Sequence, residues 1–337
     1  MTTLTGVRIT RSVVAATAAV LLLPFPAAAQ TFDAVGTRAA AMGGASVAVA
    51  DDASAVYWNP AGFAFGSSVS LVVDRRDGQT DPPDTDRAGN RSSFLLAFGT
   101  PALGLSYYRL RTTSLVEVPS PSQDPGTPGQ VQLDTLISQH TGVTFVQSLF
   151  QGLAVGTTVK LVRGVAATAI AVDGDRDALL DLGADLDGEA TTKFDLDVGV
   201  MARFGTLKTG VTFRNLTEPS FETPGGVRRL TLTRQARAGV ALVPGRYIVA
   251  ADFDLLRTPG TYGDERVFAV GGEVHLIRQA VARAGLHLNT LSGSPDGTTY
   301  TLGGSYKVRG GILVDAQINQ GSDRTERGWG LAARFVY

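Results

Sequence analysis

Cysteine is absent from the 337 residues, and only three histidines occur. Without thiols the chain can form neither a disulfide framework nor a thiolate metal site. Its 30 basic and 31 acidic residues nearly balance, so no general attraction to nucleic acid is expected. No phosphate-binding loop and no dinucleotide fingerprint is present. We therefore predict no cofactor, no metal, no catalytic residue and no nucleic-acid partner.

Long hydrophobic runs are missing except at the N-terminus. There, "VVAATAAVLLL" follows Arg8 and Arg11 and precedes "PFPAAA", whose last residues suit signal peptidase. Eleven apolar residues fall short of the roughly 20 that span a bilayer as a helix, which disfavours a transmembrane anchor. Residues 1–29 are therefore predicted to be a signal peptide for export.

Period-two alternation dominates the rest of the chain. In "FDLDVGVMARF", which begins at Phe194, apolar residues alternate with aspartate, glycine, methionine and arginine, as in a strand with one apolar face. About fourteen such segments of about ten residues follow one another, the length that a tilted strand needs to cross a membrane. They begin near residues 67, 91, 102, 135, 152, 192, 206, 231, 245, 264, 279, 297, 310 and 327.

Short and long connections alternate between these segments. Tight connections are expected near 100, 149, 205, 244, 278 and 309, and longer polar ones at 76–90, 112–130, 164–191, 217–229, 257–263, 290–296 and 320–326. This asymmetry is typical of periplasmic turns and extracellular loops. A soluble β-sandwich is the alternative, but it does not explain why charged residues recur on the same face of nearly every strand. The predicted fold class is all-β: a transmembrane antiparallel β-barrel of about 14 strands, residues 66–337.

The last residues, "WGLAARFVY", end the chain on an aromatic strand face that includes Phe335 and Tyr337. This ending resembles the signal that barrel-assembly machinery recognises in its clients. The resemblance implies insertion into the outer membrane of a Gram-negative bacterium.

Residues 30–65 do not share the strand period. "VGTRAAAMGGASVAVADDASAVYWNPAGFAF" resembles the N-terminal signature of FadL-type outer-membrane transporters and their smaller PorV/TraF-like relatives. The residues that carry the resemblance are Gly36, Arg38, Gly43, Gly44, Asp51, Asp52, Asn59, Pro60 and Ala61. In that family the segment folds as a hatch inside the lumen of a fourteen-stranded barrel. The alternative is a periplasmic segment that only leads into the barrel.

The chemistry of this segment suits a hatch. Asp51 and Asp52 can cap a short helix and pair with arginines of the barrel wall. Pro60 restricts the residue before it to an extended conformation. The aromatic side chains can wedge against the wall or line a ligand pocket, and they are Tyr57, Trp58, Phe63 and Phe65.

The polar residues that alternate with apolar ones in each strand predict a lumen wall that carries both positive and negative charges. Either these groups pair to hold the barrel and hatch together, or they form a polar path for solutes. The residues expected to line the lumen are Asp195, Asp197, Arg203, Arg214, Arg237, Arg246, Asp252, Asp254, Glu273, His275, Arg283 and His287.

Two other features invite chemical interpretations. The acidic loop Asp173–Glu189 opens like a calcium-binding EF-hand, but it has Ala178 at the glycine position and Ala184 at the closing glutamate position. A solvated loop with one helical turn is the better interpretation. His275 and His287 lie on the polar faces of neighbouring predicted strands and could meet in the lumen, where hydrogen bonding is expected of them instead of catalysis.

The resemblance implies passive uptake of a small hydrophobic molecule, gated by the hatch. The alternatives are a PorV/TraF-like adaptor of a secretion or surface-assembly system, which fits the short mature chain and its polar, proline-rich loops, and a general porin, which the hatch disfavours. Expected partners are outer-membrane lipid and lipopolysaccharide, the barrel-assembly machinery, and either a small hydrophobic ligand or a secretion-system protein. The chain is expected to be a monomer.

Overall fold

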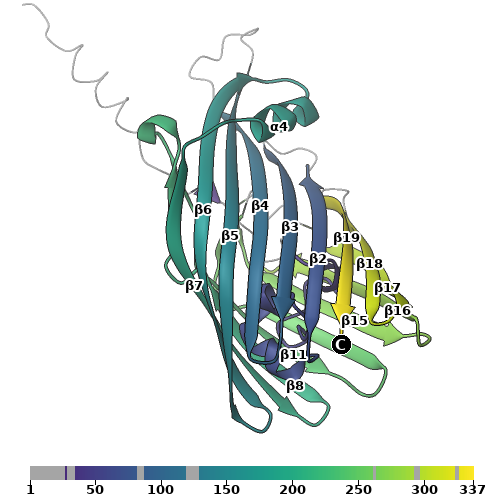
Figure 1. Cartoon of the computed structure of the whole chain (residues 1–337). Coiled ribbons are helices and arrows are strands. Elements are labelled where there is room, and N and C mark those ends of the chain that lie inside the picture. Colours follow the sequence, from purple (N-terminus) through teal and green to yellow (C-terminus); the bar gives the residue numbers. More distant parts are fainter. Residues whose placement is uncertain are drawn as a thin grey trace, which may run out of the picture.

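The computed structural model describes residues 27–28, 35–81, 87–118, 129–260, 263–291, 297–322 and 326–337 (Figure 1). Nearly all of the predicted signal peptide lies outside these residues and stays a prediction. Among the residues described, no helix is both long and apolar enough to cross a membrane.

A closed antiparallel barrel of fourteen strands accounts for most of the described chain, which confirms the predicted fold class and strand count. Neighbours in the barrel follow chain order, and the ring closes where the last strand pairs with the first. The strands are β2 (Ser70–Thr80), β3 (Arg87–Gly99), β4 (Leu103–Val118), β5 (Gln130–Phe150), β6 (Leu153–Val172), β7 (Ala190–Phe204), β8 (Leu207–Arg214), β11 (Gln235–Leu242), β12 (Tyr247–Asp254), β15 (Val267–His275), β16 (Ala280–Asn289), β17 (Thr299–Arg309), β18 (Ile312–Gly321) and β19 (Glu326–Val336).

Smaller elements lie before the barrel and in its long connections. They are β1 (Ala27–Ala28), α2 (Thr37–Ala41), α3 (Ala55–Trp58), η1 (Pro60–Phe65), α4 (Arg176–Ala184), β9 (Ser220–Glu222), η2 (Pro224–Gly226), β10 (Arg229–Thr231), β13 (Thr258–Gly260) and β14 (Gly263–Glu265). β1, β9 and β10 form one small sheet, and β13 pairs with β14. β1 falls within the predicted signal peptide.

Short and long connections alternate around the ring, as predicted. Several strands are longer than the expected ten residues: β5 has 21 and β6 has 20. Their hydrogen-bonded ladder continues into the predicted loops, past the point where strict alternation ends in the sequence. The long connections on that side are correspondingly shorter than predicted, and β2 to β7 rise well above the other strands in Figure 1.

The two faces of the wall differ sharply in chemistry. Large apolar side chains face outward and stay exposed, for example Leu302 at 58% and Ile318 at 62%, whereas inward charged groups such as Asp197, Asp252 and Arg283 are buried. A soluble sandwich would bury the apolar face instead. An exposed apolar belt around a closed ring is the arrangement that a lipid environment requires.

Backbone hydrogen bonds also close the lower end of the ring. The amide of Val69, just before β2, donates to the carbonyl of Tyr337 over 3.1 Å, and the amide of Tyr337 donates back over 2.9 Å. The C-terminal residue is therefore fixed at the seam between β19 and β2, with its ring 82% exposed.

Candidate functional site

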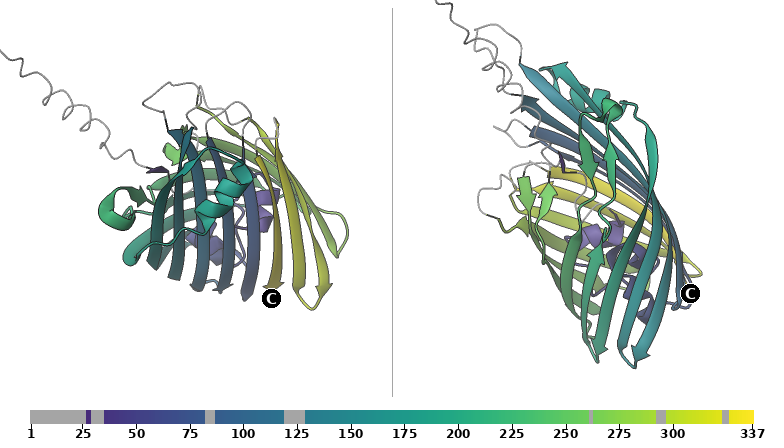
Figure 2. Two further views of the ribbon diagram at one scale, coloured as in Figure 1. Left: turned by 90° about the horizontal axis from the view of Figure 1, so that it is seen from above. Right: turned by 90° about the vertical axis from the view of Figure 1, so that its left-hand side faces the viewer.

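Residues 35–66, called the inner segment below, lie inside the barrel, where Figure 2 shows them within the ring of strands. α2 packs against β16 to β19 and β2, and η1 packs against β5, β6 and β7. Between them, α3 contacts β4. The segment therefore spans the lumen between opposite sides of the wall, and almost all of its residues are buried.

Asn59 fixes the junction between α3 and η1. Its backbone is extended (φ −161°), as the following Pro60 requires, and its side-chain oxygen accepts a hydrogen bond from the amide of Ala61. The side-chain amide donates to the carbonyls of Val47 and, in β7, Val200. One side chain thus ties two parts of the inner segment to the wall.

Glycines of the wall make room for this backbone. A β-carbon at Gly156 would overlap the backbone of Pro60, and one at Gly285 would overlap the amide of Gly43. Comparable close approaches occur around the ring, often at directly paired positions. The inward glycines concerned are Gly99, Gly104, Gly156, Gly199, Gly210, Gly239, Gly271, Gly285, Gly303 and Gly330.

Charged side chains join the inner segment to two strands of the wall, β15 and β19. Arg38 contacts Asp51 at 2.7 Å and Glu273 of β15 at 3.1 Å. Asp52 contacts Arg334 of β19 at 2.9 Å and Arg38 at 3.4 Å. The expected pairing of the adjacent aspartates with a wall arginine is therefore present.

These contacts set the charge state of the segment. Burial alone would raise the pKa of Asp52, but the guanidinium groups of Arg334 and Arg38 hold it well below its usual range. Burial alone would lower the pKa of Arg38, and three neighbouring carboxylates raise it instead. Both groups are consequently ionised over the physiological pH range.

Wall side chains also accept hydrogen bonds from backbone amides of the inner segment. The amide of Thr37 donates to Asp74 of β2 over 2.6 Å, and the amides of Ser46 and Val47 both donate to Asp252 of β12. Thr301 of β17 accepts from Gly43 and donates to the carbonyl of Ala41. A sequence does not show which side chain will accept a hydrogen bond from a given backbone amide, so this role of Asp74 and Thr301 was not predicted.

The four aromatic residues of the segment are packed side chains. Tyr57 and Trp58 are fully buried, Phe63 is 3% exposed, and Phe65 is half-buried. Trp58 donates its indole N–H to the carbonyl of Val35 over 3.1 Å. Their use as a ligand pocket therefore requires movement of the inner segment.

Three arginines of the wall lie over these rings, with Arg237 6.0 Å from the ring centre of Trp58. The Arg214 guanidinium is 3.5 Å from the ring centre of Tyr57, and that of Arg203 is 5.3 Å from Phe65. Tyr108 of β4 meets Tyr57 edge-on, with ring centres 5.5 Å apart. Cationic wall groups thus hold the aromatic end of the inner segment.

Other lumen residues pair within the wall. Lys160 of β6 lies 3.0 Å from Asp195 and 2.7 Å from Asp197, all fully or almost fully buried. Arg237 contacts Asp254 at 2.5 Å and reaches the carbonyl of Gly44. The interpretation of these charges as a pairing network agrees with these contacts.

A further cluster lies near the seam, where Arg283 contacts Glu273 at 2.7 Å and Asp315 at 3.4 Å. Arg334 also pairs with Asp315. It therefore links the lumen cluster to the inner segment through Asp52.

Two predicted lumen residues lie elsewhere. Arg246 is exposed in the turn before β12, with its guanidinium over Tyr247. His275 is also exposed, at the end of β15 near Glu273. His287 is on the inward face of β16, in phase with Arg283, and lies 3.5 Å from Glu326. The two histidines do not meet: His287 is paired with Ala269, six residues along β15 from His275.

The acidic loop forms a nine-residue helix, longer than the single turn expected, and its Leu179 and Leu180 are buried against the wall instead of solvated. α4 begins after Asp175, whose carboxylate accepts a hydrogen bond from the amide of Ala178. Within the part of the chain that the structure describes, no three histidine, aspartate or glutamate side chains converge as metal ligands would.

Comparisons with known proteins agree with this geometry. The Pseudomonas putida toluene transporter TodX superposes with a TM-score of 0.58 at 13% identity, over 93% of this chain and 97% of TodX. The Ralstonia pickettii toluene transporter TbuX gives 0.62 at 14%, over 91% and 99%, and a Pseudomonas aeruginosa FadL homologue gives 0.54 at 14%, over 93% and 99%. The fold is that of FadL-type transporters. Among curated proteins no sequence matches.

A second comparison concerns the sequence alone. Residues 130–254 match the family model described as "F plasmid transfer operon, TraF, protein". This range covers β5 to β12, which is the side of the barrel opposite the seam. Both likenesses agree with the resemblance to the FadL-type barrels and their smaller TraF-like relatives.

Proposed function

We propose that this protein is an outer-membrane channel for the passive uptake of small hydrophobic molecules, and that the inner segment is its hatch. The observation that carries the proposal is the docking of residues 35–66 across the lumen by ion pairs, amide hydrogen bonds and close packing on wall glycines. None of these contacts is covalent, so they can be exchanged when the segment moves. The FadL-type fold, shared with two toluene transporters, supports the same proposal.

Ligand movement needs no chemical step. A hydrophobic molecule would displace the aromatic end of the segment, around Tyr57 and Trp58, from the wall. The displaced charges remain paired within the wall, for example Lys160 with its two aspartates, so opening does not strip every buried ion of its partner.

Conductance tests the hatch. The mature barrel, refolded into planar bilayers, is compared with a variant that lacks residues 30–65. We expect a closed wild type and a deletion variant with steady open channels. A deletion variant that folds, as judged by its mobility in unheated gels, yet stays closed would exclude a continuous lumen.

Ligand binding needs a separate measurement. The chain contains two tryptophans, Trp58 inside and Trp329 outside. With Trp329→Phe, the emission of Trp58 alone reports on the inner segment. Titration with toluene, chosen because of the transporters of like fold, should give a saturable change in emission that Tyr57→Ala weakens.

The second candidate is an adaptor of a secretion or surface-assembly system, favoured by the match of residues 130–254 to the TraF model. An adaptor needs no ligand and no opening. It predicts closed wild type and closed deletion variant together with no saturable response to toluene.

A further inference from the structure

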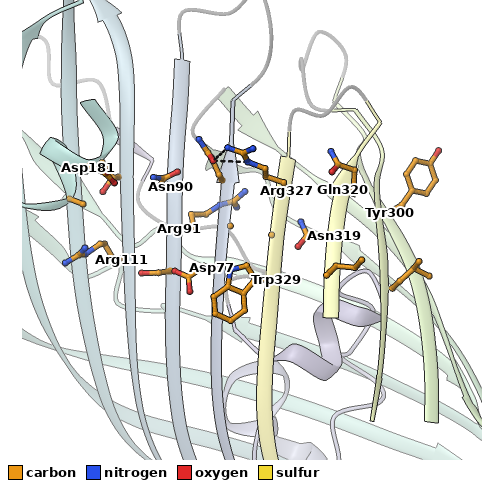
Figure 3. A pocket seen from close by; sticks show the side chains of 18 residues that line it. Asp77, Asn90, Arg91, Arg111, Asp181, Tyr300, Asn319, Gln320, Arg327 and Trp329 are labelled. Carbon is orange, nitrogen blue, oxygen red and sulfur yellow. Dashed lines mark hydrogen bonds between the residues drawn. The ribbon is translucent and has the colours of Figure 1, made fainter. Parts of the chain in front are cut away.

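The outside of the barrel carries a groove of about 780 Å³ near the seam, shown from close by in Figure 3. Six strands and α4 line it. Two cross-strand rows of paired residues form its floor. The first row is Leu302, Ile318, Trp329, Asp77, Ser92 and Arg111, and the second is Tyr300, Gln320, Arg327, Gln79, Asn90 and Thr113.

These rows belong to the outward face. Ile318 is 62% exposed and Trp329 is 43% exposed, and both continue the apolar belt of the barrel. The residues that precede and follow them in their strands point into the lumen, as Gln317 does, which is 3% exposed. The groove is therefore separate from the lumen and from the inner segment.

The first row of the groove is apolar at one end and polar at the other. In it, β17, β18 and β19 contribute Leu302, Ile318 and Trp329, while β2, β3 and β4 contribute polar groups; the second row adds the polar Gln320 and Arg327 of β18 and β19. An aromatic residue such as Trp329 between the two halves is typical of the boundary between the apolar layer and the headgroups. The groove thus crosses that boundary.

Some of its polar atoms have no protein partner. The buried Nε of Arg111 and the side-chain oxygen of Asn90 make no hydrogen bond within the described residues. Among the described residues, Arg327 donates to the neutral Gln79 alone, so its charge is not neutralised by that contact. The nearby acid Asp77 is already paired with Arg75 at 3.1 Å.

The acidic side of the rim comes from α4, outside the wall, which contributes Asp181. Gln79 bridges to α4 by donating to Asp177 over 2.6 Å. The helix therefore forms one side of the groove without covering the two arginines, which leaves donors available to an anion.

We propose that this groove binds lipid A, the phosphorylated glycolipid of the outer leaflet, with its acyl chains along Trp329, Ile318 and Leu302 and its phosphates at Arg111 and Arg327. Guanidinium groups are the preferred partners of phosphates. The two arginines stand three strands apart in adjacent rows, a backbone separation of about 15 Å. A disaccharide with a phosphate at each end matches such a span, whereas phosphatidylglycerol offers one phosphate. The site rests on the proposed outer-membrane location but not on transport.

The test uses the whole barrel with its inner segment, in a zwitterionic detergent. Bisphosphorylated lipid A is titrated and the bound lipid is counted by native mass spectrometry. The double variant Arg111→Gln, Arg327→Gln should bind at least tenfold more weakly than wild type. Arg163→Gln is the matched control, because Arg163 is an exposed outward arginine of β6 outside the groove, and it should stay within twofold of wild type.

A local reporter shows where the lipid binds. With Trp58→Phe, emission comes from Trp329 alone, which should respond to lipid A over the same concentration range. Unchanged lipid A affinity in the double variant, or equally tight binding of phosphatidylglycerol, would overturn the proposal. The arginine variants, which lie outside the lumen, should migrate as folded barrels and keep the wild-type conductance, so a failed lipid site is distinguishable from a failed channel.

Discussion

Asp52 and Arg334 are 282 residues apart in the sequence, yet their charged groups lie 2.9 Å apart inside the barrel. One belongs to the inner segment and the other to the last strand. Both are almost fully buried, at 2% and 7% exposed. This ion pair couples the inner segment to the last strand of the barrel.

Asp52→Asn should loosen the inner segment by about 3 kcal/mol, because Arg334 then remains buried with less compensation. Protease cleavage within residues 35–66 should become faster, and brief channel openings should appear. Arg75→Gln is the control: it removes an exposed pair and should change neither measurement. Equal behaviour of both variants would contradict a role for the pair in docking.

Docking should withstand moderate acid. The pKa of Asp52 is lowered in the folded state, so its contribution is complete above the unfolded value of about 4 and is lost only as pH falls through the folded value. With Trp329→Phe, the Trp58 emission should be constant from pH 7 to about pH 4. A transition near neutral pH would contradict this assignment, and Asp52→Asn should weaken any transition in stronger acid.

Gly285→Val should expel part of the inner segment, since its side chain would occupy the place of the Gly43 backbone. The barrel should still form, and its conductance should approach that of the deletion variant. Gly272→Val is the matched control on the neighbouring strand, because a β-carbon there comes no closer than 3.6 Å to another group. A closed Gly285→Val channel would show that the segment can shift without opening the lumen.

Lys160→Met should destabilise the barrel by about 3 to 5 kcal/mol, because Asp195 and Asp197 lose their buried cation. The midpoint of thermal unfolding should fall. Lys193→Met, at an exposed position of β7, should leave the midpoint nearly unchanged. A second change, Asp197→Asn, should recover part of the loss in the Lys160→Met background.

The barrel was predictable because each strand repeats a local pattern. Alternation in segments such as Phe194–Phe204 can be recognised from neighbouring residues alone. Every strand shows it, because one face of each strand contacts lipid and the other faces the polar lumen. Strand ends were less predictable: β5 and β6 continue into the predicted loops, where the β6 extension "GVAATAIAV" is apolar at nearly every position and so does not alternate.

Inside the lumen, sequence reasoning found charges but not their partners. Asp52 was expected to meet a wall arginine, and the structure shows which one. The ring of glycines was missed because each glycine, taken alone, resembles an ordinary weak position in a strand. Arg246 and His275 were misplaced because a period of two does not show where a strand ends and a turn begins. The outer groove depends on register across six strands, which no single segment encodes.

The seam between β2 and β19 has a consequence for the order of assembly. The inner segment hydrogen-bonds to Asp74 on one side of the seam and pairs with Arg334 on the other. The first and last barrel strands, which are synthesised farthest apart, therefore both bind the inner segment. The inner segment is enclosed when these two strands pair. Closure of the cylinder and enclosure of its contents become a single event.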